Sequence, residues 1–160
     1  MTESHKLRVF LCHSSQDKLI IREIYQRLND EGWFDLWLDE EKLLPGQNWN
    51  LEIEKALENT DAVIVCLSSQ SVTKEGYVQK ELKLVLDIAL EKPEGTIFLI
   101  PLRLEDCDVP RGLRQFHRAD YFGDNKEKSY TNLVSALKER MVNMEAQKQI
   151  EDLKARFKLR

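Results

Sequence analysis

The sequence has no hydrophobic run long enough to cross a membrane. Its longest apolar stretch, Thr96 to Leu104, contains a proline and an arginine and is far shorter than the roughly 20 residues of a spanning helix. The first eight residues are polar and hold no apolar signal-peptide core. Only three cysteines are present, and Cys12 and Cys66 lie inside apolar runs, which suits a reducing compartment better than a disulfide framework. These absences predict a cytoplasmic protein with no membrane partner.

The chain also lacks the strong positive charge of a dedicated nucleic-acid binder, because its formal net charge is −4. Only its end is basic: residues 138–160 hold seven Lys or Arg against four Asp or Glu, a net of +3. A length of 160 residues with 42% hydrophobic and 32% charged side chains is typical of one globular domain with a sizeable core. No direct contact with nucleic acid is expected.

Glycine is missing where several nucleotide-binding folds require it. The segment after the first predicted strand, residues 13–17, reads His-Ser-Ser-Gln-Asp, which excludes a dinucleotide-binding glycine-rich turn and a Walker phosphate loop. The first and third predicted strands end in Cys12-His13 and Ser68-Ser69 rather than in the acidic residues of a phospho-acceptor site. There is no G-x-S-x-G nucleophile elbow, and the cysteines and histidines have no metal-ligand spacing.

What the sequence does contain is an alternation of apolar strands and amphipathic helices. The strongest predicted strand, residues 62–67, is a continuous apolar run without alternation, which is typical of a strand covered on both faces. The predicted strands are residues 8–12, 34–38, 62–67, 96–102 and 119–122, and the predicted helices follow residue 18, span 51–58, open at 77 and run from 126 onward. This order predicts an α/β fold with a parallel sheet. Ligands of such sheets bind at the carboxyl-terminal strand ends, where the loops 13–18, 39–50 and 68–76 gather.

Several local signals mark where these elements begin and end. Ser14 with Asp17 resembles a capping box for the first helix, and Gly32 is expected to cap its end. Pro101 is expected at or near the end of the pairing of its strand. Residues 43–46, Leu-Leu-Pro-Gly, place two leucines directly before a turn. These leucines either form an exposed contact surface or fold back on their own domain.

The last predicted helix has an apolar pattern that is interrupted before the end of the sequence. An apolar stripe at helical spacing is interrupted at Gln147-Lys148, and its first members are Leu133, Leu137, Met141 and Met144. We therefore predict a domain over residues 1–144 and a helical extension over residues 145–160. The extension is a linker to another domain, an oligomerising helix, or a terminal helix that lies on the sheet and frays beyond Gln147.

One carboxylate beside an aromatic ring is the remaining candidate for chemistry. Tyr77 and Glu81 lie four residues apart, which places them on one face of the predicted helix. An ordinary glycosidase needs two carboxylates, because the leaving oxygen must be protonated. Nicotinamide leaves a dinucleotide from a bond that already carries positive charge, so one carboxylate that stabilises an oxocarbenium-like transition state suffices. The alternative is a solvated Glu81 with a tyrosine at the rim of the core.

Several segments, in order, resemble the Toll/interleukin-1 receptor (TIR) domain. They are Phe10–Asp17, Trp37-Leu38-Asp39, Leu44-Pro45-Gly46, Ser68 and Tyr77-x-x-x-Glu81. The likeness covers about residues 7–142 and implies a flavodoxin-like sheet of five parallel strands, in the order 2-1-3-4-5, with helices on both faces. It also implies that Leu43, Leu44, Pro45 and Gly46 belong to the BB loop, which mediates contacts between TIR domains.

The resemblance implies one of two functional classes. One class is a scaffold that assembles signalling complexes without chemistry. The other class cleaves NAD+ at the nicotinamide–ribose bond with a glutamate that matches Glu81, and often has a tryptophan where this chain has Tyr77. A tyrosine can still stack and also donate a hydrogen bond. NAD+ is then the substrate, with no further cofactor and no metal. The substrate-binding positions implied by the resemblance are Tyr77, Trp37, His13, Ser14, Ser15, Asp39 and Ser68.

The first hypothesis is an NAD+ glycohydrolase whose site is completed by the loop of a neighbouring protomer. Bacterial enzymes of this kind resemble effectors of antiphage immunity that a fused sensor domain switches on by driving assembly. The second hypothesis is a non-catalytic TIR scaffold in which Glu81 is a bystander. The expected protein partners are other TIR domains, in a homo-oligomer or filament. A third, a nucleoside deoxyribosyltransferase with a similar single glutamate, is disfavoured by the Leu-Pro-Gly loop.

Overall fold

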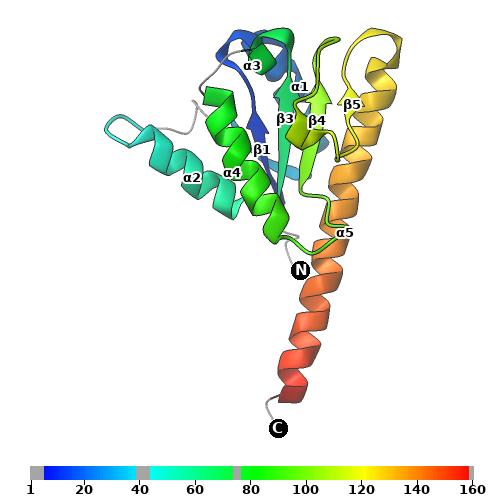
Figure 1. The fold of residues 1–160 in the computed structure, drawn as a ribbon. Helices are drawn as coiled ribbons and strands as arrows, with labels where there is room; N and C mark the ends of the chain where they lie inside the picture. The colour runs from blue at the N-terminus through cyan, green and yellow to red at the C-terminus, as the bar shows by residue number, and fades with distance from the viewer. Residues whose placement is uncertain (1–5, 39–43, 74–76, 159–160) are drawn as a thin grey trace.

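In the computed structural model the chain alternates strands and helices around one sheet (Figure 1). The structure describes residues 6–38, 44–73 and 77–158, with only the backbone at residues 15, 38, 49–50, 73 and 77–81. The strands are β1 (Leu7–Cys12), β2 (Phe34–Leu38), β3 (Ala62–Leu67), β4 (Leu99–Arg103) and β5 (Ala119–Asp120). The helices are α1 (Lys18–Glu31), α2 (Trp49–Asn59), α3 (Ser69–Thr73), α4 (Tyr77–Glu91) and α5 (Lys126–Lys158). Short 3-10 helices are η1 (Ser15–Asp17), η3 (Arg111–Leu113) and η4 (Gly123–Asn125).

The five strands are all parallel and run in the order β2-β1-β3-β4-β5. This confirms the predicted flavodoxin-like order. Every residue of β3 is buried, as its continuous apolar run predicted. The order reverses between β1 and β3, which places the ligand-binding crevice of such folds at the carboxyl-terminal ends of these two strands.

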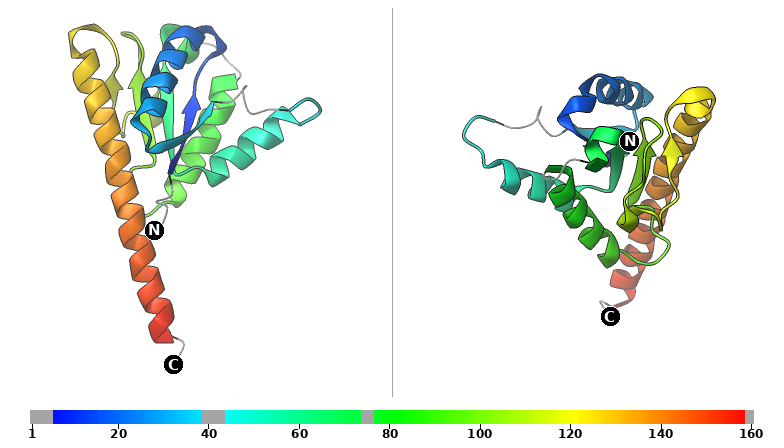
Figure 2. Two further views of the ribbon diagram at one scale, coloured as in Figure 1. Left: turned by 180° about the vertical axis from the view of Figure 1, so that it is seen from behind. Right: turned by 45° about the horizontal axis from the view of Figure 1, so that its top comes forward.

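Side chains of each strand point alternately to the two faces of the sheet, and each face has its own core. Helices α1 and α5 cover one face and α2 and α4 cover the other, as the views from the front (Figure 1) and from behind (Figure 2) show. The first core includes Val9, Leu11, Ile64, Ile24, Leu28, Leu133 and Leu137. The second includes Phe10, Cys12, Val63, Val65, Ile53, Leu57, Leu82 and Val85. The alternation of odd and even β1 residues thus decides which helices the strand contacts.

Gly32 ends α1 as predicted. Its φ is +78°, and its N–H donates to the Asn29 carbonyl at 3.2 Å. A left-handed backbone at this position satisfies the last carbonyls of the helix without a Cβ clash. The chain then turns directly into β2, so the glycine fixes the connection between α1 and the edge of the sheet.

The prediction that Pro101 lies at the end of pairing was wrong, because Pro101 pairs with Val65 in the middle of β4. The Phe98 carbonyl accepts from the Val63 N–H, and the Leu104 N–H donates to the Leu67 carbonyl. The backbone N–H and C=O groups of even-numbered residues in this segment therefore point toward β3, and the backbone nitrogen of Pro101 points away from it. Its missing N–H costs no bond to β3, which is why a proline is tolerated inside this strand.

Several other element boundaries differ from the prediction; strand β5, for example, ends at Asp120 rather than at residue 122. Two of the differences have a local cause. The segment after β3, predicted as a loop, begins with the short helix α3. The Ser68 hydroxyl accepts from the Ser71 N–H at 3.2 Å, which favours a helical turn at this point. Strand β4 begins at Leu99 rather than at Thr96, because Thr96 donates its N–H to the Pro93 carbonyl in a turn.

Helix α5 is one continuous helix of 33 residues. Its buried residues end at Leu137, and the Arg140 side chain donates from Nε to the Asp61 carbonyl at 2.9 Å. Beyond that, the helix extends past the sheet on the side of the amino-terminal strand ends (Figures 1 and 2). The helix shows no break at residue 144, and the division into a domain and an extension stays a prediction.

In the ranges that the structure describes, no helix combines the length and the apolar character needed to span a bilayer.

Candidate functional site at the carboxyl-terminal strand ends

The carboxyl-terminal ends of β1 and β3 bring together two segments that lie far apart in the sequence. The strands are hydrogen-bonded neighbours, with Cys12 opposite Val65. His13 and Ser14 follow β1, and Ser68 follows β3. These three side chains are buried, so they pack beneath the surface where the two strands end.

A hydrogen-bonded cluster joins the two strand ends. The Ser68 hydroxyl donates to Oδ2 of Asp17 at 2.8 Å, and the Ser71 hydroxyl donates to the Ser68 carbonyl at 3.0 Å. The Ser68 N–H in turn donates to the Ser71 hydroxyl at 2.7 Å. Burial raises the pKa of the Asp17 carboxyl, and the hydrogen bond from Ser68 opposes part of this rise. The loops after β1 and β3 are therefore held as one unit.

The predicted capping box is formed only in part. Ser14 caps η1, because its hydroxyl accepts from the Gln16 N–H at 3.3 Å. Asp17 makes no side-chain capping bond to α1, since its carboxylate binds Ser68 instead. The role of Asp17 was missed because its partner lies 51 positions away in the sequence.

His13 is fixed by the loop that it belongs to. Its Nδ1 lies 2.9 Å from the Ser14 carbonyl oxygen. A carbonyl only accepts, so Nδ1 carries the proton of this contact. His13 is 4% exposed and Ser14 is 6% exposed. Both residues shape the backbone at the strand end more than they present an open surface.

Glu105 is a second residue that the sequence interpretation missed. It follows β4, and its Oε2 accepts from the Ser69 hydroxyl at 2.5 Å and from the Ser69 N–H at 3.3 Å. This carboxylate raises the pKa of Asp17 further, although burial is the larger cause. The position of Glu105 three residues beyond a predicted strand end is the signal that could have drawn attention to it.

Trp37 lies one strand away from this cluster. Its ring stacks on Phe10 with centroids 4.8 Å apart and planes inclined by 14°. Trp37 also lines a cavity of about 300 Å³ between β1, β2 and α2. It belongs to the sheet face that α2 and α4 cover. The remaining walls of the cavity are Arg8, Val9, Asp35, Glu52, Lys55, Ala56, Asn59 and Thr60.

Helix α4 carries the predicted catalytic pair. The backbone of Tyr77 opens this helix, at the same end of the molecule as the carboxyl-terminal strand ends (Figure 1). Leu82 and Val85 are buried against the α2 and α4 core, which fixes the rotation of the helix. The side chains of Tyr77 and Glu81 lie outside the described residues, so their contacts stay predictions.

Other predicted site positions also fall outside what the structure describes. Asp39 and Leu43 lie outside the described residues, and so does the side chain of Ser15. The substrate-binding role assigned to Asp39 and Ser15 is therefore a prediction that stands on the sequence alone.

The Leu-Pro-Gly part of the loop before α2 forms an exposed turn. Leu44 is 67% exposed, and its N–H donates to the Gln47 side chain at 2.7 Å. The Gln47 N–H donates back to the Leu44 carbonyl at 3.1 Å. Gly46 takes a left-handed φ of +91°, which a glycine adopts without strain. Leu44 thus does not fold back onto the domain, which resolves for this residue the alternative left open by the sequence.

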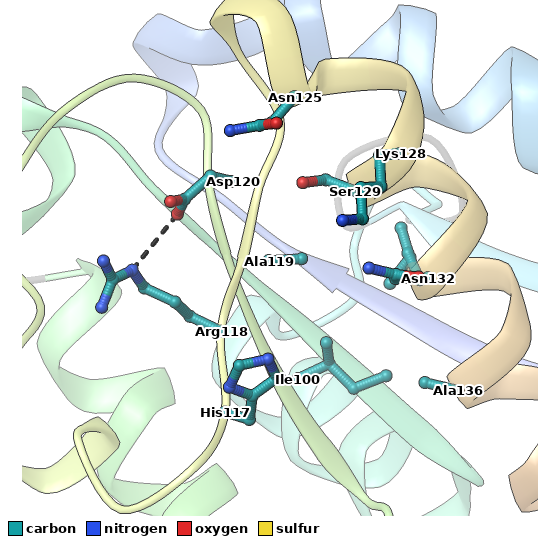
Figure 3. Close-up of a pocket in the computed structure, with 11 residues that line it drawn as sticks. Ile100, His117, Arg118, Ala119, Asp120, Asn125, Lys128, Ser129, Asn132 and Ala136 are labelled. Atoms are coloured by element: carbon teal, nitrogen blue, oxygen red, sulfur yellow. Dashed lines mark hydrogen bonds and ion pairs between the residues drawn. The ribbon is translucent and has the colours of Figure 1, made fainter.

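A further cavity, which the sequence did not predict, lies between β5 and α5 (Figure 3). Its volume is about 450 Å³, and Ser129 and Asn132 point toward it from α5 (Figure 3). On the strand side of the cavity, Nε of Arg118 lies 3.2 Å from Oδ1 of Asp120. Hydrogen bonds from Arg103 hold the pKa of Asp120 below its usual range. This cavity lies at the β5 edge of the sheet, away from the crevice between β1 and β3.

Comparison with known proteins settles the family. Residues 9–134 match the model of the family described as the TIR domain. The chain belongs to the TIR domain family. Its fold is also similar to the TIR domain of the Toll-related receptor TRR-2 from Hydra magnipapillata, with a TM-score of 0.68 and 21% identity over 81% of this chain and 97% of that one. A prokaryotic SEFIR domain is similar at a TM-score of 0.64 and 16% identity, covering 82% of this TIR domain and 99% of the SEFIR chain.

One curated relative of this TIR domain carries a functional name. The two are 33% identical over 103 residues, and the relative is named NAD(+) hydrolase TcpA, from Theionarchaea archaeon (strain DG-70-1). The match covers 64% of this chain and 30% of TcpA. The chain therefore spans less than a third of the length of this relative.

Proposed function

We propose that this TIR domain hydrolyses NAD+ at the nicotinamide–ribose bond, with Glu81 as the catalytic carboxylate. The observation that carries the proposal is the 33% identity over 103 residues with a protein named as an NAD(+) hydrolase. The position of α4 supports it, because Glu81 lies one turn into a helix that starts at the end of the molecule where the strands have their carboxyl-terminal ends. Ligands of open parallel sheets bind in the crevice at these strand ends.

The chemistry needs only one carboxylate. The bond between the ribose C1′ and the nicotinamide nitrogen breaks, and its electron pair neutralises the positive charge of the ring. The carboxylate of Glu81 stabilises the positive charge that develops on the ribose. Water then adds at C1′, which gives ADP-ribose, nicotinamide and one proton. No general acid is required, because the leaving group departs neutral.

The other predicted positions bind the substrate around this centre. Tyr77 and Trp37 form walls against the nicotinamide and ribose, while His13, Ser14, Ser15, Asp39 and Ser68 border the nucleotide. The rigid link between Asp17 and Ser68 supports this arrangement, since it keeps the loops after β1 and β3 at a fixed separation. Preorganised groups cost no rearrangement during the reaction.

The proposal includes activation by self-assembly. In it, residues 43–46 of one copy contact a neighbouring TIR domain and complete its site. The exposed Leu44 supports such a contact, because a large apolar side chain at the tip of a turn gains free energy when a partner covers it. A fused sensor domain would drive assembly in the cell, in a bacterial defence against phage.

A non-catalytic scaffold is the alternative, and the same exposed Leu44 favours it equally. A scaffold needs the contact surface but no ribosyl chemistry, and Glu81 would then be a bystander. The two functions differ in one measurable result, which is the release of nicotinamide.

Nicotinamide release from NAD+ by the 1–160 chain tests the proposal. The protein is assayed across a range of concentrations, with a crowding agent, and clustered on a solid support. Glu81→Gln is compared with Asp87→Asn, a matched loss of one negative charge at an exposed position of the same helix. Glu81→Gln should reduce release by at least about a hundredfold, because it removes the charge that stabilises the ribosyl cation. Asp87→Asn should leave it unchanged.

The outcomes separate the two functions. Release that rises steeply with protein density, and that Glu81→Gln abolishes, supports the glycohydrolase and its activation by assembly. No release at any density from a chain with a native circular dichroism spectrum would sink the enzyme and leave the scaffold.

A further inference from the structure

The end of α5 carries an apolar stripe that does not belong to the domain core. The stripe consists of Val142, Ala146, Ile150, Leu153 and Phe157. All five residues are exposed; the side chains of Val142 and Leu153 are 63% and 51% exposed. They recur at intervals of four, four, three and four residues, so they share one side of the helix.

This stripe lies on the opposite side of α5 from the core. At about 100° per residue, Ile150 and Leu153 are roughly 140–160° around the helix from Leu137. Leu137 is fully buried against the sheet, and only Met141 and Met144 continue its side of the helix with partial burial. The sheet cannot cover the second stripe, because the stripe is on the side of the helix opposite to Leu137 and the end of α5 extends past the sheet (Figures 1 and 2).

The charges around the stripe are divided into two blocks. Residues 145–152 hold Glu145, Glu151 and Asp152 against Lys148, a net of −2. Residues 154–158 hold Lys154, Arg156 and Lys158 with no acidic residue, a net of +3. A parallel helix pair would set the basic block against itself. An antiparallel pair sets the basic block of each copy against the acidic block of the other.

We infer that a second copy of this chain packs on the stripe as an antiparallel helix pair. In this register Ala146 faces Phe157 of the second copy, and Ile150 faces Leu153 of the second copy, each pairing occurring twice. A small residue opposite a large one lets the side chains of adjacent layers interdigitate. The same register brings Glu145 beside Arg156 of the second copy, because both residues lie on the same flank of the stripe.

The paired segment is short, so the dimer is weak and depends on concentration. Residues 146–157 span about 17 Å of helix, which places the contact at the small end of specific interfaces. The two TIR domains stand at opposite ends of the pair, so both strand-end crevices and both Leu44 turns stay accessible. This inference rests on the helix alone and holds whether or not the domain cleaves NAD+.

Sedimentation equilibrium of the 1–160 chain measures the association across a wide range of concentration. Ile150→Glu or Leu153→Glu should weaken the dimer at least about tenfold, since each removes a buried aliphatic contact. Leu90→Glu is the matched control, because Leu90 is 76% exposed and lies at the end of α4. Glu145→Arg should also weaken the dimer, and Arg156→Glu combined with it should restore association.

Disulfide cross-linking tests the direction of the pair. Cys12 and Cys66 are buried and Cys107 is partly exposed, so Cys107→Ser provides the background. Ala146→Cys and Phe157→Cys should each form little disulfide alone and should cross-link efficiently when the two variants are mixed. A chain that stays monomeric at every concentration, a dimer unaffected by Ile150→Glu, or stronger cross-linking within each single variant than in the mixture would overturn the inference.

Discussion

The guanidinium of Arg27 lies 3.8 Å from the centre of the Tyr130 ring, which links α1 to α5 across one face of the sheet. The same guanidinium binds Glu127 at 2.6 and 3.0 Å and donates to the Tyr121 hydroxyl at 3.0 Å. Tyr121 in turn donates to Glu23 at 2.7 Å. One planar side chain thus holds the start of α5 in place by stacking and by hydrogen bonds at once.

Arg27→Lys should lower the free energy of unfolding by about 1 kcal/mol, because a lysine keeps the charge but loses the stacking and the forked pair with Glu127. Urea unfolding followed by circular dichroism measures the loss. Arg22→Lys, at an exposed position of the same helix, is the control and should change little. Equal stability of the two variants would contradict a stabilising role for the stacked guanidinium.

Asp17 should make stability depend on pH in the acidic range. Burial is the main cause that raises its pKa, so between the ordinary value of 3.8 and the folded value the native state binds the proton more strongly than the unfolded state. The contribution of Asp17 to stability therefore falls as the pH rises through this window. Above the window, the charged carboxylate carries a desolvation cost in the folded state.

Asp17→Asn should remove this pH dependence while keeping the bond to Ser68, because an amide oxygen accepts the hydroxyl as a carboxylate does. Urea unfolding at a series of pH values compares the two proteins. The stability of the wild type relative to Asp17→Asn should fall as the pH rises from below 3.8. A constant difference across the series would show that the buried carboxyl does not titrate with a raised pKa.

The α/β fold followed from the sequence because apolar strand segments, above all residues 62–67, alternate with helices that have one apolar side. Gly32 was also predictable as a helix cap, because a glycine directly after a helical pattern is a local signal. Pro101 was not, because the sequence does not show to which neighbouring strand each N–H points. Asp17 was misassigned since its partner Ser68 is distant in the chain, and a local capping pattern was the only signal available. The cavity between β5 and α5 depends on how two distant segments pack, which no spacing records.

Only part of the candidate site could be predicted from the sequence. The placement of residues 13, 14 and 68 at adjacent strand ends follows from the parallel topology together with the strand order that the TIR resemblance implied. Glu105 and Ser71 complete this cluster, but neither matched a motif. The role of Glu81 stays a prediction, because the sequence identifies its position on α4 while its side-chain contacts lie outside the described residues.

Removing residues 145–160 should leave the domain folded. The buried part of α5 ends at Leu137, and Met141 and Met144 remain in the shortened chain. We expect the free energy of unfolding, measured by urea at low protein concentration, to change by less than about 0.5 kcal/mol. The shortened chain should be monomeric where the full chain associates. A large loss of stability in the monomer would mean that the extension packs on its own domain.

Leu44→Asp should separate folding from assembly. Leu44 is 67% exposed, so the substitution should change the free energy of unfolding by less than about 0.5 kcal/mol. If the turn contacts a neighbouring TIR domain, a buried charge there would disfavour the contact. Nicotinamide release should then lose its steep rise with protein concentration.

Leu90→Asp is the matched control for this last prediction, because Leu90 is 76% exposed and lies at the opposite end of α4 from the strand-end crevice. Both variants introduce one negative charge in place of one exposed leucine, so a general effect of charge on association would reduce activity in both. Loss in Leu44→Asp alone assigns the contact to the turn before α2. Equal activity of the two variants at every concentration would mean that Leu44 takes no part in assembly.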